Sequence, residues 1–308
     1  MNLKTNIPLL DFSSFKIGGP AEYFFEVHTR EELEEALHLA QRLQLFVLGQ
    51  GTNVLINDKG FLGLVIHNKL NGIKKQGNSL IVGSGVLVSD ILDFCIESSF
   101  SGLEWAGGLP GTIGGAVRGN AGAFGGEIKD SVISISSLNI KTLSERTRSN
   151  KECKFAYRNS VFKSGGGKEE FIASVILNLK PGNKTKIQKL IAEKIDYRNL
   201  KHPMDYPNIG SIFKNIPLGK IPQRWKKEFG GFIKTDPFPI VPTAKLLALA
   251  GLKGVKVGGA MISDKHPNFI VNADKASAKD VKNLIQIAKN AIKEKYGIIL
   301  EEEIVYLG

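Results

Sequence analysis

A run of twenty residues, 107–126, contains nine glycines. Glycine loses more backbone freedom on folding than any other residue, and an ordinary turn needs only one or two of them. A flexible linker would carry few apolar side chains, yet Leu109, Ile113, Val117 and Phe124 alternate with the glycines. The run therefore favours backbone that is packed into the fold and wraps a bulky, flat or polyanionic ligand.

Apolar periodicity on either side of this run predicts a mixture of helices and strands. Thr29 and Glu32 have capping-box spacing before a helical repeat that ends at Ala40. Strands are expected at 45–48, 54–56 and 63–67, which predicts a βαβ-like unit near the N-terminus. The other expected helices are 89–99, 184–200, 243–250 and one capped at Ser277–Asp280, and the other expected strands are 131–141, 170–179 and 298–307.

The composition excludes several classes of protein. The two cysteines form no CxxC pair and the five histidines no metal-ligand cluster, so we expect a reduced chain without a metal site. Neither a signal peptide nor an apolar stretch of membrane-spanning length is found. The net charge is +11, and residues 201–308 carry 17 basic and 10 acidic side chains. This excess indicates an anionic partner such as a phosphate, a carboxylate or nucleic acid, or simply a basic surface.

The segment 49–53, Gly-Gln-Gly-Thr-Asn, follows an expected strand. Its glycines would let backbone N–H groups approach a phosphate, and Thr52 and Asn53 would add donors. It lacks the third glycine and the following helix of a dinucleotide-binding fingerprint. Taken alone, a tight hairpin turn is the favoured interpretation.

Two other segments leave their interpretation open. Strand alternation places Glu301 and Glu303 on one face and Glu302 on the other, either at a functional site or on a solvated edge strand. Residues 216–242 hold five of the twelve prolines and Trp225. They predict an irregular excursion, either a lid over a ligand or, the favoured alternative, an insertion packed on its own domain.

The ordered set of motifs resembles the UDP-N-acetylenolpyruvoylglucosamine reductase family, whose members are flavoenzymes of peptidoglycan synthesis. The resemblance runs from about Phe15 to the C-terminus and is interrupted at 216–242. Its motifs are residues 15–21, 48–56, 102–104, 110–116, 120–125, 157–160, 210–215, 251–254, 265–269 and 300–304.

The resemblance implies an α+β fold, with a two-part FAD-binding domain of the vanillyl-alcohol-oxidase (PCMH) type and a C-terminal α/β substrate-binding domain. The domains expected from it are 1–68, 69–182 and 183–308, the last with the insertion at 216–242. Residues 49–53 and 105–126 contain no histidine for a covalent link, so we expect non-covalent FAD. The implied cofactor-binding residues are Gly49, Gln50, Gly51, Thr52, Asn53, Gly108, Pro110, Gly111, Thr112, Gly115, Ala116, Asn120 and Gly122.

The same resemblance implies that NADPH reduces the flavin and that the flavin reduces UDP-N-acetylglucosamine enolpyruvate to UDP-N-acetylmuramate. Arg158 matches the arginine that stabilises the enolate, Ser211 the proton donor, and Glu303 the second glutamate of a Leu-Glu-Pro-Glu pattern. This chain departs from that pattern at Glu302, where proline is usual. The implied substrate-binding residues are Tyr157, Arg198, Lys201, Lys214 and Asn215.

The short interval between Arg158 and Ser211 matches the family subtype without a substrate-capping tyrosine loop. We expect a cytoplasmic monomer that binds neither membrane nor nucleic acid. Two rival hypotheses remain: a different flavin oxidoreductase of the same superfamily that oxidises a sugar or an alcohol, and a nucleic-acid-binding protein. The net charge favours the second rival, but the aromatic content is 8% and no RNP-like motif is found.

Overall fold

The structure, a computed structural model, describes residues 3–308 and divides into two compact units. Unit 1 comprises the N-terminal segment to Ile7, Ala21–Gln50 and Leu62–Tyr197. Unit 2 comprises Pro8–Pro20, Gly51–Phe61 and Arg198–Gly308. Each unit therefore combines segments that are distant in sequence, and the domain boundaries expected from the family resemblance stay a prediction.

The first sheet of unit 1 has the strand order β1-β2-β5-β3. Its strands are β1 (Lys4–Pro8), β2 (Pro20–Val27), β5 (Phe61–Asn68) and β3 (Leu45–Leu48), the last two parallel. Helix α1 (Arg30–Ala40) links β2 to β3 and begins at the predicted capping box of Thr29 and Glu32. Leu33, Ala36 and Leu37 of α1 are buried in one core with this sheet, which confirms the predicted helix.

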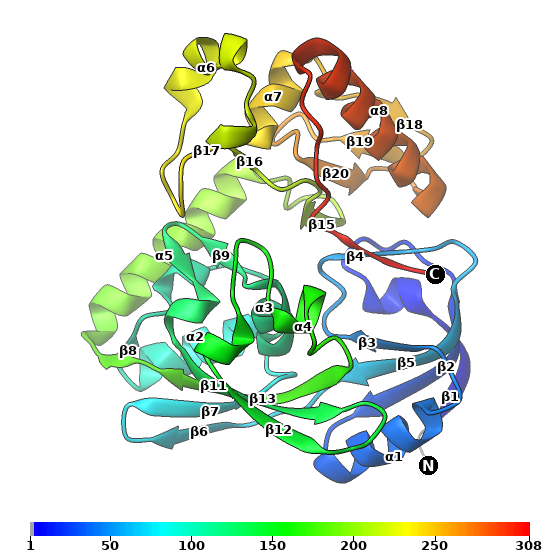
Figure 1. Ribbon diagram of the computed structural model, residues 1–308, viewed down its shortest axis with the longest axis vertical. Helices are drawn as coiled ribbons and strands as arrows, with labels where there is room; N and C mark the ends of the chain where they lie inside the picture. The colour runs from blue at the N-terminus through cyan, green and yellow to red at the C-terminus, as the bar shows by residue number, and fades with distance from the viewer. Residues whose placement is uncertain (1–2) are drawn as a thin grey trace. The chain divides into compact units, whose positions relative to one another are not determined.

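The second sheet of unit 1 is antiparallel, with the order β12-β11-β13-β7-β6. Helices α2, α3 and α4 share one hydrophobic core with it and lie together on one side of β11 and β13 (Figure 1). The bounds are β6 (Ile73–Gln76), β7 (Ser79–Gly83), α2 (Val88–Glu97), β8 (Phe100–Ser101), α3 (Ile113–Gly119), β9 (Gly122–Ala123), β10 (Gly126–Glu127), β11 (Val132–Asn139), β12 (Glu145–Ser149), α4 (Val161–Ser164), β13 (Glu170–Asn178) and β14 (Lys180–Pro181).

The glycine-rich run contains a helix that its composition did not predict. The side chain of Thr112 caps α3 by accepting from the Gly115 N–H at 3.3 Å, and the helix ends at Asn120, which has φ +44°. A Cβ atom added to Gly114 would lie 2.9 Å from the Cβ of Ser84. Close packing of α3 against its neighbours therefore explains part of the glycine content without a ligand.

The sheet of unit 2 has the order β15-β20-β19-β18, with β15 (Asn208–Ser211), β20 (Phe269–Asn272), β19 (Ala260–Ile262) and β18 (Lys256–Val257). Helix α8 (Ala278–Tyr296) lies along β18 and β19 (Figure 1). Its predicted capping box, Ser277 with Asp280, is present, and its predicted apolar face is buried. Helices α5 (Lys184–Lys201) and α7 (Thr243–Leu249) have the predicted positions.

Two strand predictions are wrong. The regular closing strand, β21, comprises Val305–Leu307 and not the whole of 298–307. The predicted hairpin at 49–53 is absent from the described residues, because β3 pairs with β5 while β4 (Val54–Ile56) pairs in parallel with β21. Both errors have one cause: β4 and β21 find their partners about 250 residues away, which local patterns do not encode.

The insertion at 216–242 is packed on unit 2. Strands β16 (Ile216–Pro217) and β17 (Ile240–Val241) pair at its base and helix α6 (Gln223–Phe229) forms its outer part. Phe229 is fully buried, and the Trp225 Nε1 donates to the Tyr296 carbonyl at 3.1 Å. This is the arrangement that the hypothesis of an insertion packed on its own domain expects.

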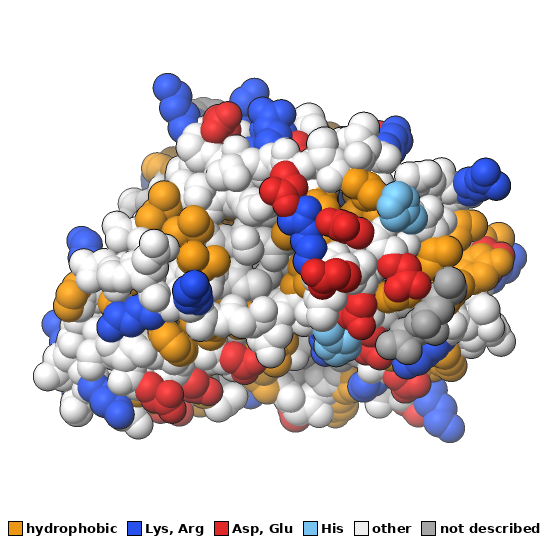
Figure 2. Space-filling view, turned by 90° about the horizontal axis from the view of Figure 1, so that it is seen from below, with side chains coloured by type: hydrophobic (Ala, Val, Ile, Leu, Met, Phe, Trp, Pro, Cys, Tyr) orange, Lys and Arg blue, Asp and Glu red, His pale blue; other side chains and the backbone are white. Residues whose placement is uncertain are grey.

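One face of the molecule carries both positive and negative side chains. Figure 2 shows a face on which Lys and Arg side chains stand among Asp and Glu side chains, with several carboxylates gathered in one area. The net charge of +11 therefore does not produce a uniformly basic surface on that face. Over residues 3–308, no helix is long and apolar enough to cross a lipid bilayer.

Candidate functional site

Two segments predicted to bind the cofactor meet in unit 1. The Gln50 Oε1 accepts a hydrogen bond from the Gly111 N–H at 2.7 Å. A Cβ atom on Gly49 would lie 2.7 Å from the Thr112 Oγ1, so only glycine allows this approach. Gly111 has φ +113°, a conformation that side chains other than hydrogen disfavour. The sequence residues 49–50 and 110–112 therefore form one continuous backbone surface.

This surface fits a dinucleotide cofactor. Gly108, Pro110 and Gly115 are exposed, and a Cβ on Gly115 would meet only the Thr112 Oγ1, at 3.5 Å. Buried Ala116, on the same helix, keeps the backbone close behind this opening. Exposed backbone without side chains is what a diphosphate and a flat ring system need for close contact. These residues would hold FAD in unit 1.

Other predicted cofactor residues have roles inside the protein. The Asn120 side-chain amide donates to Glu127 and to the Ala156 carbonyl, both at 3.0 Å, and the residue is fully buried. Thr52 and Asn53 belong to unit 2. There the Asn53 side chain donates to the Glu303 carbonyl at 3.3 Å and so supports the segment of a predicted catalytic residue.

Arg158 stands at the tip of a tight turn in unit 1. Ala156 and Asn159 exchange two backbone hydrogen bonds of 3.0 Å, which leaves Tyr157 and Arg158 as the two turn residues. Arg158 has φ +55°, a conformation that turns usually give to glycine or asparagine. Such strain is typical of functional residues that the surroundings hold in place. Here the Arg158 Nη2 donates to the Gly122 carbonyl at 2.8 Å, which ties the guanidinium to the glycine-rich run.

Ser211 ends strand β15 beside a bulge. The register between β15 and β20 shifts between Asn208 and Ser211, and Gly210 has φ +79°. Glycine in the left-handed conformation is the usual first residue of such a bulge, which re-aims the side chain that follows. Gly210 has open space around its α-carbon, so the backbone conformation, not crowding, requires glycine here.

Glu303 lies beside the Ser211 loop in unit 2. The Glu303 N–H donates to the Ile212 carbonyl at 2.8 Å, and the Lys214 N–H donates to the Glu301 carbonyl at 2.9 Å. The two predicted catalytic residues of unit 2, Ser211 and Glu303, are thus held on adjacent segments. They are 92 positions apart in the numbering, which is why the pairing could be expected only from the family resemblance.

Adjacent glutamates of this segment have different partners. Glu302 binds the Lys289 ammonium and the Tyr306 hydroxyl. Burial, and to a lesser extent the hydrogen bond to Glu302, raises the pKa of Tyr306. The phenol therefore stays protonated and donates to Glu302. Glu301 instead forms ion pairs with Lys214, at 3.4 Å, and with Lys220. The predicted alternation of faces thus separates Glu301 from Glu302 although the segment is not a regular strand.

The predicted substrate-binding residues are distributed over both units. Tyr157 lies in unit 1, where the Arg158 guanidinium carbon is 5.2 Å from its ring centroid. Arg198, buried, and Lys201, exposed, occupy the last turn of α5 in unit 2. Lys214 is half-buried, and Asn215 follows it in the loop after β15.

Two supporting residues were missed by sequence reasoning. Buried Asn268 accepts from the Phe213 N–H at 3.0 Å and donates to the Phe213 carbonyl at 2.8 Å, which fixes the loop after Ser211. The Thr243 Oγ1 donates to the Lys214 carbonyl at 2.6 Å. Asn268 belongs to the family motif 265–269, which could have pointed to it. No sequence motif pointed to a supporting role for Thr243.

Two histidines border β20 in unit 2. The His202 and His266 rings lie 5.2 Å apart edge to face, and each also contacts Phe269, the residue paired with Ser211. Burial lowers the pKa of each imidazole to about 4. Both rings are therefore neutral near pH 7 and act as packing groups beside the Ser211 strand.

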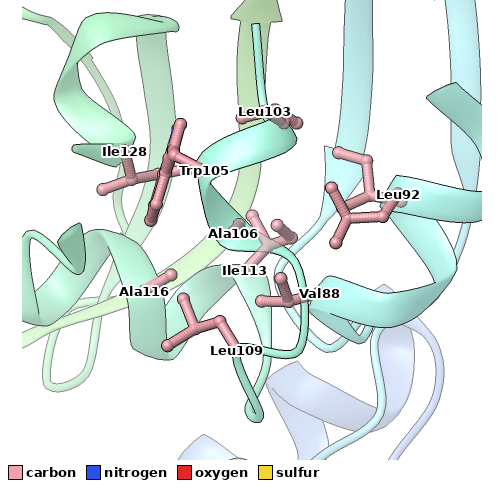
Figure 3. A pocket seen from close by; sticks show the side chains of 10 residues that line it. Val88, Leu92, Leu103, Trp105, Ala106, Leu109, Ile113, Ala116 and Ile128 are labelled. Atoms are coloured by element: carbon pink, nitrogen blue, oxygen red, sulfur yellow. The ribbon is translucent and has the colours of Figure 1, made fainter. Parts of the chain in front are cut away.

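An apolar pocket in unit 1 lies next to the glycine-rich run. Trp105, Leu109 and Ile128 are among the side chains that surround it (Figure 3). The lining is hydrocarbon apart from the Trp105 indole N–H, so the pocket has a single polar donor and no cationic side chain for a phosphate or a carboxylate. It belongs to the core behind the backbone surface that fits FAD.

Comparisons with known proteins match two long segments of the chain to known protein families. The FAD binding domain family matches residues 21–140, and the C-terminal domain of UDP-N-acetylenolpyruvoylglucosamine reductase matches residues 202–307. The crystal structure of the UDP-N-acetylenolpyruvylglucosamine reductase of Thermus caldophilus is 30% identical, with a TM-score of 0.78. That comparison covers 99% of this chain and 98% of the other.

Curated relatives agree over the full length. The UDP-N-acetylenolpyruvoylglucosamine reductase of Caldanaerobacter subterraneus subsp. tengcongensis is 36% identical, covering 99% of this chain and 94% of the relative. That of Clostridium novyi is 34% identical, covering 99% of this chain and 92% of the relative. The predicted family and the PCMH-type fold are thereby confirmed, and the chain belongs to the UDP-N-acetylenolpyruvoylglucosamine reductase family of FAD-dependent oxidoreductases.

Proposed function

We propose that this protein catalyses the NADPH-dependent, FAD-mediated reduction of the enolpyruvyl group of UDP-N-acetylglucosamine enolpyruvate, which yields UDP-N-acetylmuramate for peptidoglycan synthesis. Full-length similarity to reductases of that name carries this proposal. The glycine surface of unit 1 and the Ser211–Glu303 arrangement of unit 2 supply the groups that the reaction needs.

FAD supplies hydride chemistry when bound: it accepts hydride from NADPH and delivers it to the β-carbon of the enol ether. The residues proposed to hold it are those of the unit 1 surface, Gly49, Gln50, Gly108, Pro110, Gly111, Thr112, Gly115 and Ala116. Gly122 is proposed to act indirectly, because its carbonyl accepts a hydrogen bond from Arg158. Asn120 is proposed to support the glycine-rich run through its hydrogen bond to Glu127. Gly51, Thr52 and Asn53 belong to unit 2, and their role in cofactor binding stays a prediction from the family resemblance.

Arg158 is proposed to stabilise the charge that develops on the substrate carboxylate. Addition of hydride to the β-carbon places electrons on the α-carbon and the carboxylate, as an enolate. A guanidinium presents a planar pair of donors to such a group and remains charged. The strained turn and the bond to Gly122 keep the Arg158 side chain in place before the charge forms.

Ser211 is proposed to donate the proton that completes the reaction at the α-carbon. A serine hydroxyl is a weak acid, but an enolate carbon is a strong base, so the transfer is feasible at close range. The bulge at Gly210 and the hydrogen bonds of Asn268 to Phe213 hold the backbone on both sides of Ser211 in place. Glu303 is the third residue proposed to be catalytic. Its backbone N–H donates a hydrogen bond to the carbonyl of Ile212, the residue after Ser211.

The UDP part of the substrate requires cations. We assign its diphosphate to Arg198, Lys201 and Lys214, with Tyr157 and Asn215 as further contacts. Arg198 and Lys201 end the same helix, and Thr243 fixes the backbone of Lys214. Lys201 and Lys214 account for part of the basic excess of residues 201–308 without nucleic acid as a partner.

Three finer features also belong to the proposal. The chain is a cytoplasmic monomer that binds neither membrane nor nucleic acid. It belongs to the subtype without the tyrosine loop, since the interval from Arg158 to Ser211 is occupied by α4, β13, β14 and α5. Its domains are 1–68, 69–182 and 183–308.

The purified protein is expected to be yellow, with one FAD per chain that acid or heat denaturation releases into the supernatant. The expectation follows from a binding surface of backbone and small side chains without histidine. Absorption spectra of supernatant and pellet after precipitation provide the measurement. Flavin that stays with the pellet would contradict non-covalent binding, and a colourless protein that cannot be loaded with FAD would contradict the proposed function.

A further inference from the structure

The insertion at 216–242 places a lysine beside the diphosphate-binding loop. Lys220, near its start, and Lys214, before it, both form ion pairs with Glu301. The Glu301 backbone carbonyl also accepts a hydrogen bond from the Lys214 N–H at 2.9 Å, which keeps the two residues adjacent. One carboxylate therefore serves two ammonium groups, and the three side chains together carry one uncompensated positive charge.

The backbone around Lys220 is fixed on both sides. Before it, Ile216 and Pro217 pair with Val241 and Ile240, and the Leu218 N–H donates to the Pro239 carbonyl at 2.9 Å. After it, Ile221 is buried in the core of unit 2. The backbone of Lys220 is therefore already fixed, so only its side chain has to be ordered to form the ion pair with Glu301.

The far end of the insertion returns to Lys214. The Thr243 N–H donates to the Asn215 Oδ1 at 3.2 Å, and the Thr243 Oγ1 donates to the Lys214 carbonyl at 2.6 Å. The insertion thus leaves from and comes back to the loop that carries Lys214 and Asn215.

Without Lys220, Glu301 would have Lys214 as its nearest cation, and the pair would be neutral. A diphosphate that approaches Lys214 would then have to compete with a carboxylate 3.4 Å from the Lys214 ammonium. With Lys220 present, the carboxylate has a second partner. The pKa of Glu301 is lowered, first by its hydrogen bond to Lys220, which agrees with Lys220 as the dominant partner.

We propose that Lys220 is a positioning residue for substrate binding: it engages Glu301 and thereby leaves Lys214 available to the diphosphate of the UDP-sugar. The proposal rests on the proposed function, which assigns the diphosphate to Lys214. It gives the insertion an electrostatic task that needs no movement of the segment.

The test is a double-mutant cycle on the FAD-loaded protein, with UDP as the probe and uridine as the probe without phosphate. Exposed ion pairs are worth little, so Lys220→Met should weaken UDP binding by about two- to fivefold. It should leave uridine binding unchanged. Glu301→Gln should bind UDP as tightly as the wild type or more tightly, and in that background Lys220→Met should have no further effect.

Isothermal titration calorimetry at low salt measures each Kd, because higher ionic strength screens the effect. Lys227→Met is the matched control, since it removes the same charge from an exposed position of helix α6 and should leave the UDP affinity unchanged. Three results would overturn the proposal. They are an unchanged UDP affinity in Lys220→Met, an equal loss for uridine, and the same loss in the presence and absence of Glu301.

A further variant separates this inference from the proposed function. Lys214→Met should weaken UDP binding more than Lys220→Met does, because it removes the proposed contact itself. If Lys214→Met binds UDP like the wild type, the assignment of the diphosphate fails and the role of Lys220 fails with it. If only Lys220→Met behaves like the wild type, the assignment stands and the role of Lys220 alone is refuted.

Discussion

Replacing Ser211 by alanine is expected to slow reoxidation of the reduced flavin by UDP-N-acetylglucosamine enolpyruvate by about 10²- to 10⁴-fold, the usual contribution of general acid catalysis. NADPH-driven bleaching of the flavin should remain nearly unchanged, because that half-reaction needs no acid at the α-carbon. The substitution is small, and the Ser211 backbone keeps its place through the β15–β20 pairing and the hydrogen bonds of Asn268 to Phe213.

Stopped-flow absorbance at the flavin band measures the two half-reactions separately. Ser211→Thr is the control that keeps a hydroxyl, and it should retain more of the second half-reaction than Ser211→Ala. Equal slowing of both half-reactions in Ser211→Ala would show that Ser211 has a structural role instead of donating the proton.

Glu303→Gln is expected to lower kcat by about 10²-fold or more, since it removes a proposed catalytic carboxylate. Glu302→Gln makes the same chemical change one residue earlier and should leave kcat within about twofold. The two glutamates differ in their contacts. The Glu302 side chain binds Lys289 and Tyr306, whereas the Glu303 backbone N–H donates to the carbonyl of Ile212, next to Ser211.

Steady-state kinetics of the two variants, with flavin content as the check on folding, provide the comparison. Similar losses of kcat in Glu302→Gln and Glu303→Gln would mean that the segment matters only for structure. A loss confined to Glu302→Gln would move the catalytic role to the residue that replaces the usual proline.

Local patterns predicted the elements whose stability is local. Both capping boxes, Thr29 with Glu32 and Ser277 with Asp280, are present, and the helices that follow bury the expected faces. Such helices are set by side chains within a few turns of one another, so one stretch of sequence contains the whole signal.

The errors arose where a distant segment decides the structure. The loop after β3 was interpreted as a hairpin because the partner of β4, strand β21, lies at the other end of the chain. Helix α3 was missed because glycine disfavours helices, and the close packing of Gly114 against Ser84 cannot be read from the sequence. The isolated sequence contained neither contact.

The candidate site shows the same division. Gln50 and Gly111 are 61 residues apart, and Ser211 and Glu303 are joined through Ile212, so neither pairing follows from spacing. The family resemblance supplied the roles of these residues, and the structure adds their supports, Asn268 and Thr243. The ion pair of Lys220 with Glu301 could not be anticipated from motifs, since Lys220 lies in the insertion at 216–242, where the family resemblance is interrupted.

Anaerobic turnover of the purified protein distinguishes the proposed reduction from the rival flavin oxidations. With excess NADPH and limiting UDP-N-acetylglucosamine enolpyruvate, we expect one NADPH to be oxidised for each enolpyruvyl group consumed, with a product two hydrogens heavier. Absorbance at the nicotinamide band and mass spectrometry of the product measure both quantities in one sample. NADPH oxidation at a rate independent of the enolpyruvyl compound, or turnover that requires oxygen and a sugar or alcohol, would rule out the proposed reaction.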